Sequence, residues 1–411
     1  MSEQKFDFTS IIDRKDKDAF AIDALGMEEF KGMAPSKPKE GFDIIPMWVA
    51  DMNFAVPPSI INEIKNRLNH PLFGYFFPKK EYYNAIINWQ EKRNGVQNLK
   101  EENIGYENGV LGGVVSACNI LCSRGDKILI HSPTYIGFTM CLENNGYKII
   151  HSPLYQDQND NLKWKMNYND MEEKIKKEKI HCAIFCNPHN LCGRDWEKEE
   201  ILKAMEIFEK YDVQVISDEI WSDLILFNNK HIPVQSVNDY AKYNTIAFYA
   251  PTKTFNLAGL IGSYHIIYNK KLKDRIVKES SLSHYNSMNI LSMYALIGAY
   301  DKIGEEWLEE LKQVLSKNVD FVVNFIKDKF KGVKVYKPEG TYMLFADCEE
   351  WCKNNNKSLD DVLNGCWDVG AVIQSGKAFH GEWFIRINVA SPFERIKEGF
   401  ERMDKYVFNK K

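Results

Sequence analysis

The run Tyr249-Ala-Pro-Thr-Lys-Thr-Phe-Asn-Leu-Ala-Gly259 decides the fold of this 411-residue chain. Lys253 stands between two hydroxyl residues, Thr252 and Thr254, and a glycine closes the run. A lysine amine in this setting can form an imine with an aldehyde, while a neighbouring hydroxyl donates to a phosphate. The run alone is only moderately specific, so its meaning depends on the motifs that precede it.

Two motifs upstream supply polar groups directly after expected strands. Asp218, in Ser217-Asp-Glu-Ile220, ends the strand expected at 213–217, and Asn187 follows the strand expected at 181–186. Asp218 can keep a pyridine nitrogen protonated, and the Asn187 amide can donate to a phenolate oxygen. Taken singly, the aspartate could be a helix N-cap and the asparagine a turn opener. Together with Lys253 they resemble the layout of a pyridoxal phosphate (PLP) enzyme of the aspartate aminotransferase fold type.

A phosphate site and a stacking ring are predicted from two further helix starts. The run Glu107-Asn-Gly-Val-Leu-Gly-Gly113 opens a helix, whose first N–H groups form an anion site. Those expected donors belong to Gly109, Val110 and Leu111. The glycine spacing does not match the dinucleotide motif Gly-x-Gly-x-x-Gly. Thr252 would add a hydroxyl to the phosphate, and Tyr135, after the strand expected at 127–130, could lie on the pyridine face.

Arg386 is the candidate for binding a substrate carboxylate. It is the charged residue inside the apolar strand expected within Gly381-Glu-Trp-Phe-Ile-Arg-Ile-Asn-Val-Ala390. A charge in such a strand is costly unless it is paired, and a bidentate clamp on an amino acid carboxylate accounts for it. An internal salt bridge is the alternative.

The order of helical and strand patterns predicts an α/β fold. Short apolar strands alternate with helices through the first two thirds of the chain, which favours a mainly parallel sheet covered by helices. Strands are expected at 127–130, 147–150, 181–186, 213–217, 244–249 and 263–268. Helices are expected at 59–69, 80–94, 110–122, 135–144, 168–178 and 197–211, with a helical region from about 284 to 328. The active site of such a sheet lies at the carboxyl ends of the strands.

Three parts of the chain are expected. An N-terminal segment, 1–55, packs with the small domain, and a large cofactor-binding domain spans 56–290. A small α+β domain spans 291–411, with strands at 333–336, 341–346 and 383–387 and a helix at 391–408.

Composition limits the classes of partner. The net charge of −4 and the pI near 6.2 give no reason to expect nucleic acid or an anionic membrane as partner. No signal peptide or apolar stretch of membrane-spanning length is predicted. The nine scattered cysteines do not form a secreted disulfide framework or show metal-site spacing. We therefore expect a cytoplasmic enzyme without a metal.

The motifs together resemble the MalY/PatB-type carbon–sulfur lyases, the cystathionine β-lyase and cystalysin group within class I/II aminotransferase-like PLP enzymes of fold type I. The match runs over nearly the full length of the chain. The matching runs are Trp48-Val-Ala-Asp-Met-Asn-Phe54, Phe73-Gly-Tyr75, Ser132-Pro-Thr-Tyr135, Asn187-Pro-His-Asn190, Ser217-Asp-Glu-Ile220, Ala250-Pro-Thr-Lys-Thr-Phe-Asn256, Pro338-Glu-Gly-Thr-Tyr342 and Arg386-Ile-Asn388.

The resemblance implies a role for each candidate residue. Lys253 would carry PLP covalently, Asp218 would pair with the ring nitrogen, and Asn187 would contact the phenolic oxygen. The substrate would be a small amino acid, held by Arg386 and Tyr135, with Tyr135 also stacking on the ring. Tyr75 would reach the phosphate of the other subunit, which implies a homodimer with shared active sites.

Four positions depart from the family pattern. The usual Asn-Pro-His-Asn-Pro-x-Gly-Arg reads Asn187-Pro-His-Asn-Leu-Cys-Gly-Arg194, and Trp221 stands where histidine is usual. Asn53 replaces an acidic residue, and Thr252 replaces a serine but keeps the hydroxyl. The first three changes leave the substrate open.

The resemblance implies α,β-elimination from a cysteine-S-conjugate such as L-cystathionine or L-cysteine, giving pyruvate, ammonia and a thiol. Transamination by an enzyme of class I/II is the alternative, followed by amino acid racemisation. All three reactions need the same lysine, aspartate and arginine, so the motifs do not separate them.

Overall fold

A seven-stranded sheet forms the centre of the computed structural model, which describes residues 5–282 and 286–409. The strand order is β2-β10-β9-β8-β7-β3-β4. β10 is antiparallel to both of its neighbours, and the other neighbouring pairs are parallel, which confirms the predicted mainly parallel sheet. The strands are β2 Ile104–Glu107, β3 Lys127–Ser132, β4 Lys148–Pro153, β7 Cys182–Cys186, β8 Gln214–Asp218, β9 Thr245–Tyr249 and β10 Ser263–Ile266.

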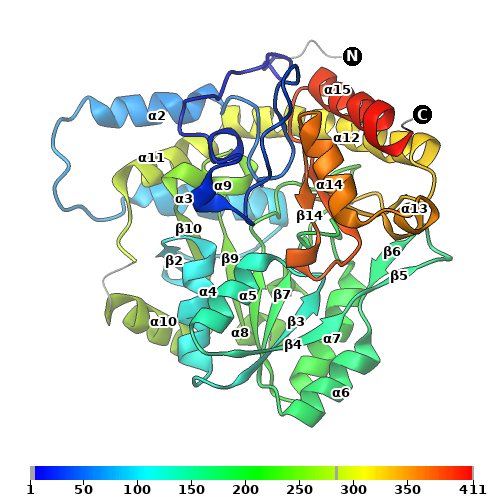
Figure 1. Cartoon of the computed structure of the whole chain (residues 1–411). Helices are drawn as coiled ribbons and strands as arrows, with labels where there is room; N and C mark the ends of the chain where they lie inside the picture. Colours follow the sequence, from blue (N-terminus) through cyan, green and yellow to red (C-terminus); the bar gives the residue numbers. More distant parts are fainter. Residues whose placement is uncertain (1–4, 283–285, 410–411) are drawn as a thin grey trace.

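Helices cover both faces of this sheet because successive strand residues point to opposite sides. In β7, Ile184 packs into the core under one group of helices and Phe185 into the core under the other. The first group is α4 Val110–Leu121, α5 Ile136–Asn144 and α10 Lys270–Leu282. The second is α6 Tyr168–Glu178, α7 Lys198–Lys210 and α8 Asp239–Asn244. The labels in Figure 1 locate both groups around the strands.

The C-terminal unit is a small antiparallel sheet with helices. Its strand order is β11-β12-β15-β14, as expected of an α+β lobe. The strands are β11 Lys334–Val335, β12 Met343–Asp347, β14 Gln374–Ser375 and β15 Phe384–Asn388. The helices are α13 Glu349–Asn354, α14 Leu359–Asp368 and α15 Phe393–Met403, which continues as a π-helical turn over Asp404–Phe408.

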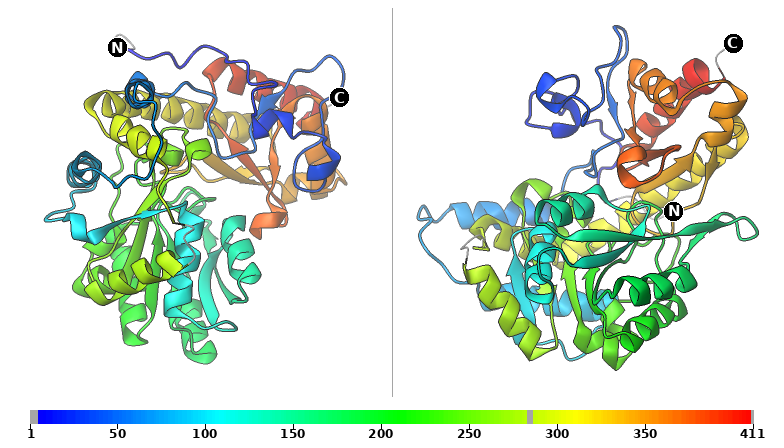
Figure 2. Two further views of the ribbon diagram at one scale, coloured as in Figure 1. Left: turned by 90° about the vertical axis from the view of Figure 1, so that its left-hand side faces the viewer. Right: turned by 60° about the horizontal axis from the view of Figure 1, so that its bottom comes forward.

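The N-terminal segment lies against the C-terminal unit. Its short strand β1, Ile45–Pro46, pairs in parallel with β13, Ala371–Val372. Figures 1 and 2 show the blue N-terminal chain beside the orange and red C-terminal elements. The segment also contains one short helix, α1 Phe20–Asp23. The domain boundaries at 55 and 290 stay predictions.

The helices between these units follow the predicted pattern with one break. α2, Pro58–Leu68, and α3, Lys80–Asn94, are joined by a loop that projects from the body at the left of Figure 1. The helical region expected from 284 divides into α11, Ile290–Ala299, and α12, Lys302–Lys329. Residues 283–285, at its start, lie outside the described residues. Across residues 5–282 and 286–409, none of the helices has both the length and the apolar character needed to span a bilayer.

Candidate active site

A cavity of about 330 Å³ lies at the carboxyl edge of the large sheet. It collects residues that the sequence places far apart: Asn108, Gly109, Val110, Leu111, Tyr135, Asn190, Asp218, Trp221, Thr252 and Lys253. A larger hollow of about 660 Å³, between the N-terminal segment and α15, contains none of these residues. The smaller cavity therefore marks the candidate active site.

Lys253 lies on α9, Pro251–Thr254, a single helical turn directly after β9. Its Nζ donates to the carbonyl oxygen of Ala50 at 2.9 Å and lies 6.0 Å from the centre of the Trp221 ring. Burial, with a smaller contribution from the positive charge of Arg386, lowers the Lys253 pKa to about 8. The amine is thus neutral in a useful fraction of molecules near neutral pH, as a nucleophile or base must be.

Asp218 ends β8 and is buried. Its Oδ1 accepts a hydrogen bond from the backbone N–H of Ile220 at 3.0 Å. Burial raises the Asp218 pKa to about 6, and the negative charge of Glu219 acts in the same direction. A cationic ring nitrogen placed against this carboxylate would offset the cost of its burial.

The phosphate end of the cavity is the start of α4. Gly109 precedes the helix with φ of 88°, a left-handed conformation that favours glycine. The Gly113 N–H donates to the Gly109 carbonyl, so the N–H groups of Val110 and Leu111 lie ahead of the first helical hydrogen bond. Thr252 lines the same cavity. These groups match the predicted phosphate site.

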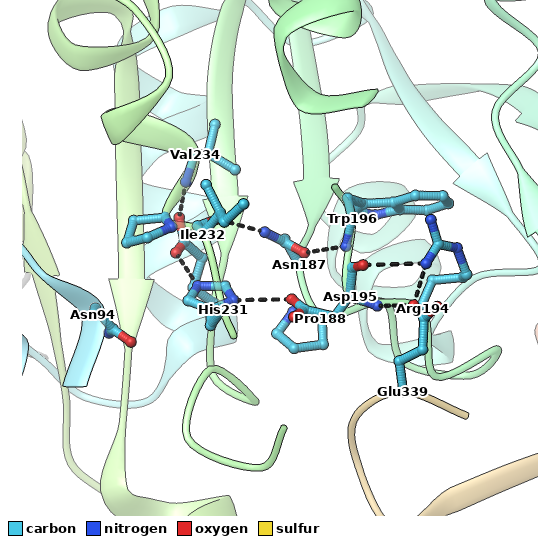
Figure 3. Close-up of polar contacts among 12 residues, drawn as sticks. Asn94, Asn187, Pro188, Arg194, Asp195, Trp196, His231, Ile232, Val234 and Glu339 are labelled. Carbon is cyan, nitrogen blue, oxygen red and sulfur yellow. Dashed lines mark hydrogen bonds and ion pairs between the residues drawn. The ribbon is translucent and has the colours of Figure 1, made fainter. Parts of the chain in front are cut away.

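Asn187 forms two side-chain hydrogen bonds within the protein, and its predicted contact with a phenolic oxygen stays a prediction. Its Nδ2 donates to the Ile232 carbonyl at 3.0 Å, and its Oδ1 accepts from the Trp196 N–H at 3.1 Å, as Figure 3 shows. Asn187 does not line the cavity, whereas Asn190 does. Within the described part of the chain, the buried Asn190 Oδ1 has no hydrogen-bond partner. The motif contains both asparagines, and their spacing does not reveal which one turns inward.

Arg386 is buried in β15, and no carboxylate within residues 5–282 and 286–409 forms an ion pair with it. Its Nη1 donates to the Trp48 carbonyl at 3.2 Å and to Gln374 Oε1 at 2.6 Å. Nε and Nη2 are buried without a hydrogen-bond partner among the residues that the structure describes. Burial lowers the Arg386 pKa to about 10. Two unpaired donors along one edge of the planar guanidinium match the two oxygens of a carboxylate. The alternative of an internal salt bridge is therefore not supported.

Two tyrosines accompany Arg386. Tyr135 caps α5 and lines the cavity, and burial raises its pKa. Tyr342, missed as a site residue, has a buried hydroxyl without a partner in residues 5–282 and 286–409. Its ring meets Trp221 edge to face, with centroids 4.8 Å apart. The Pro338-Glu-Gly-Thr-Tyr342 motif was the available signal for Tyr342.

Two of the departures from the family pattern, Asn53 and Cys192, have local polar partners. Asn53 Oδ1 accepts from Arg14 Nη1 at 2.8 Å. The Cys192 thiol lies 3.0 Å from His189 Nδ1, and both residues are buried. Trp221, in contrast, is part of the cavity wall. Trp221 and Thr252 are therefore the departures with direct access to a ligand.

Tyr75 is not brought to this cavity in the single chain. It lies in the loop between α2 and α3 and is fully exposed. A phosphate contact from Tyr75 thus requires a second subunit.

A separate cluster lies at the opposite edge of the sheet. One ligand atom each from Cys122, Asp126 and His181 lies within 4.8 Å of the other two. The sequence spacing does not predict this proximity, because Asp126 precedes β3 and His181 precedes β7. The Asp126 carboxylate already accepts from the Ser123 N–H at 2.7 Å and lies 3.5 Å from His181 Nε2. The cluster is thus accounted for as a capped turn with an ion pair.

Comparisons with known proteins agree with this geometry. The model of the family "Aminotransferase class I and II" matches residues 43–403. Cystathionine beta-lyase PatB of Bacillus subtilis is 31% identical over 88% of this chain and 92% of its own length. A PLP-bound protein from Clostridium difficile 630 shares 34% identity, with a TM-score of 0.88 over 97% of this chain and 99% of its own.

The PLP-bound C–S lyase from Staphylococcus hominis shares 30% identity, with a TM-score of 0.86 over 98% of each chain. The predicted resemblance is thus confirmed, together with fold type I and the cofactor. The chain belongs to the aminotransferase class I and II family and is a PLP-dependent enzyme.

Proposed function

We propose that the protein is a cysteine-S-conjugate β-lyase that cleaves the Cβ–S bond of L-cystathionine, L-cysteine or a related amino acid. The observation that carries this proposal is the full-length likeness to the C–S lyase of S. hominis and to PatB. The site geometry supports it, because it combines a partly neutral lysine with an unpaired buried arginine.

PLP fits the residues that line and surround the cavity. The start of α4 and Thr252 would hold the phosphate, Asp218 the ring nitrogen and Asn190 the phenolic oxygen. The raised Asp218 pKa is the feature of this chain that a bound cofactor would relieve. Bound there, PLP supplies an electron sink for a negative charge at the substrate α-carbon.

The residues of the chain would perform three tasks in the reaction. Nε and Nη2 of Arg386 bind the α-carboxylate and fix the orientation of the substrate. The Lys253 amine takes the α-proton. The Cβ–S bond then breaks with its electron pair on sulfur, which leaves as a thiol after protonation. With one water consumed, the products are the thiol, pyruvate and ammonia.

Transamination, the alternative, and racemisation use the same groups and differ in where the proton returns. The discriminating experiment incubates purified holoenzyme with L-cystathionine, L-cysteine or S-alkyl cysteines, without a 2-oxo acid. A lyase releases pyruvate and ammonia in stoichiometric amounts over many turnovers. An aminotransferase stops after one turnover per site and resumes only when a 2-oxo acid is added, and that result would replace the lyase assignment.

The attachment of PLP is tested separately. Borohydride reduction followed by peptide mapping should place the pyridoxyl group on Lys253, because it is the lysine that lines the cavity. Lys253→Ala should abolish the label, while Lys273→Ala provides a control at a half-buried lysine whose pKa is also lowered to about 8. A label that persists in Lys253→Ala would contradict the assignment.

We also propose a homodimer with shared sites in the cytoplasm. The loop between α2 and α3 exposes a run of large apolar side chains, as expected of a surface that another subunit covers. These are Leu72, Phe73, Tyr75 and Phe77. All nine cysteines are free, which is typical of a reducing compartment.

A further inference from the structure

A buried ionic network lies beside the Asp218 end of the cavity. Glu219 is fully buried, and its Oε2 accepts from His231 Nε2 and from the Tyr249 hydroxyl, each at 2.8 Å. Its Oε1 accepts from Ser217 Oγ at 2.9 Å and from the Val234 N–H at 3.2 Å. The Glu219 carboxylate is therefore held by four donors from separate parts of the chain.

His231 links Glu219 to a second buried carboxylate. Its Nδ1 lies 3.2 Å from Asp195 Oδ1, while Nε2 faces Glu219. A neutral imidazole donates from one nitrogen only, so two carboxylate partners require the imidazolium. These ion pairs outweigh burial and raise the His231 pKa to about 9. The side chain is thus a buried cation between two anions.

The network joins the two loops that carry cofactor-facing groups. Glu219 directly follows Asp218, and Asp195 ends the loop from Asn187 that contains Asn190. Asn187 adds a parallel connection between the segment at Ile232 and that loop, as Figure 3 shows. The Asn187 N–H also donates to the Asp218 carbonyl at 2.9 Å.

The positive charge of His231 also affects the protonation of Asp218. The negative charge of Glu219 favours the protonated form of Asp218, which cannot pair with a cationic ring nitrogen. A cation bonded to Glu219 opposes this effect. Loss of that cation would leave Glu219 buried and uncompensated next to the residue that must stay ionised.

We propose that His231 is a positioning residue for PLP: as a cation bridging Glu219 and Asp195, it fixes the loops of Asp218 and Asn190 and balances the charge behind Asp218. It touches neither cofactor nor substrate and acts through these two residues. The proposal depends on PLP binding at the cavity, not on whether the enzyme is a lyase or an aminotransferase.

The test measures PLP affinity of the apoprotein together with its thermal stability. His231→Gln keeps a donor but removes the charge, and we expect its PLP Kd to rise about tenfold or more. The double variant Glu219→Gln/His231→Gln removes both charges, and its Kd should return to within about threefold of wild type. Tyr249→Phe removes a neutral donor to the same carboxylate and should change the Kd less than His231→Gln.

Two outcomes would overturn the proposal. One is a fall in the melting temperature of His231→Gln with an unchanged PLP Kd, which indicates a merely structural role. The other is a double variant that binds PLP no better than His231→Gln. Binding is measured by equilibrium titration, so loss of lyase activity alone would not affect the result.

A measurement on the unaltered protein covers the case in which His231→Gln does not fold. Histidine-selective ¹⁵N spectra of the holoenzyme at pH 8 should contain an imidazole with both nitrogens protonated. An ordinary histidine, with a pKa near 6.5, is neutral at that pH. Spectra with no doubly protonated imidazole would remove the cation on which the proposal rests.

Discussion

Asp218→Asn should stabilise the apoprotein while it impairs the cofactor site. The Asp218 pKa is raised from 3.8 to about 6, so the folded state disfavours the carboxylate. Between these values the folded protein binds a proton that the unfolded chain has released, and stability falls as the pH rises. This rise in pKa corresponds to a destabilisation of the folded state by about 3 kcal/mol, which is fully present above pH 6. Asparagine has nearly the same shape and carries no charge.

The assay is urea unfolding of apoprotein at pH 5 and pH 8, at equal protein concentration. At pH 8 the variant should gain up to about 3 kcal/mol, and at pH 5 about half as much, because most of the wild-type carboxyl group is then protonated. PLP affinity should fall, since the partner of the ring nitrogen is lost. A variant that is no more stable at pH 8, or whose gain does not shrink at pH 5, would refute the reasoning.

Three further experiments test other parts of the site. Arg386→Ala should raise KM for the amino acid about tenfold or more and leave the PLP Kd unchanged, because a charge-assisted clamp is lost; titrations with PLP and with substrate separate the two, and weakened PLP binding with normal KM would make Arg386 structural. Asn190→Ala should shift the absorbance-monitored pH titration of the bound cofactor more than an alanine control at exposed Asn354; equal spectra would remove Asn190 from the cofactor site. Verified heterodimers of Tyr75→Phe and Lys253→Ala subunits should regain activity, because one hybrid site carries neither change; no recovery, given a strong defect in each parent, would contradict the shared site.

The large sheet could be predicted from sequence because its strands are continuous apolar runs. β7, Cys182–Cys186, is buried at every position, and turns directly precede β3 and β8. β2, Ile104–Glu107, escaped this criterion because Gly105 and the charged Glu107 interrupt its pattern. Its place in the sheet depends on pairing with β10, a contact more than 150 residues away.

The asparagine motif shows where a local pattern stops being informative. Asn187 and Asn190 are three residues apart, and both side chains are polar, buried and next to the cavity loop. The choice between them is made by partners outside the motif, the Ile232 carbonyl and the Trp196 N–H, which occupy Asn187. Such long-range hydrogen bonds leave no periodic signal in the chain.

The position of the catalytic lysine also depends on a contact with a distant part of the sequence, the N-terminal segment. Lys253 Nζ donates to the carbonyl oxygen of Ala50. On either side of Ala50, the carbonyls of Val49 and Asp51 accept from Asn388 Nδ2, each at 2.6 Å. Arg386, two residues before Asn388, donates to the Trp48 carbonyl. Lys253 and Arg386 thus both donate to carbonyl groups of the backbone segment 48–51, although more than 130 residues separate the two side chains in the sequence. A shift of this backbone segment would displace both the Lys253 amine, which takes the proton, and the Arg386 guanidinium, which binds the carboxylate. Substitutions at Asn388 should therefore affect both proton removal and substrate affinity rather than either alone.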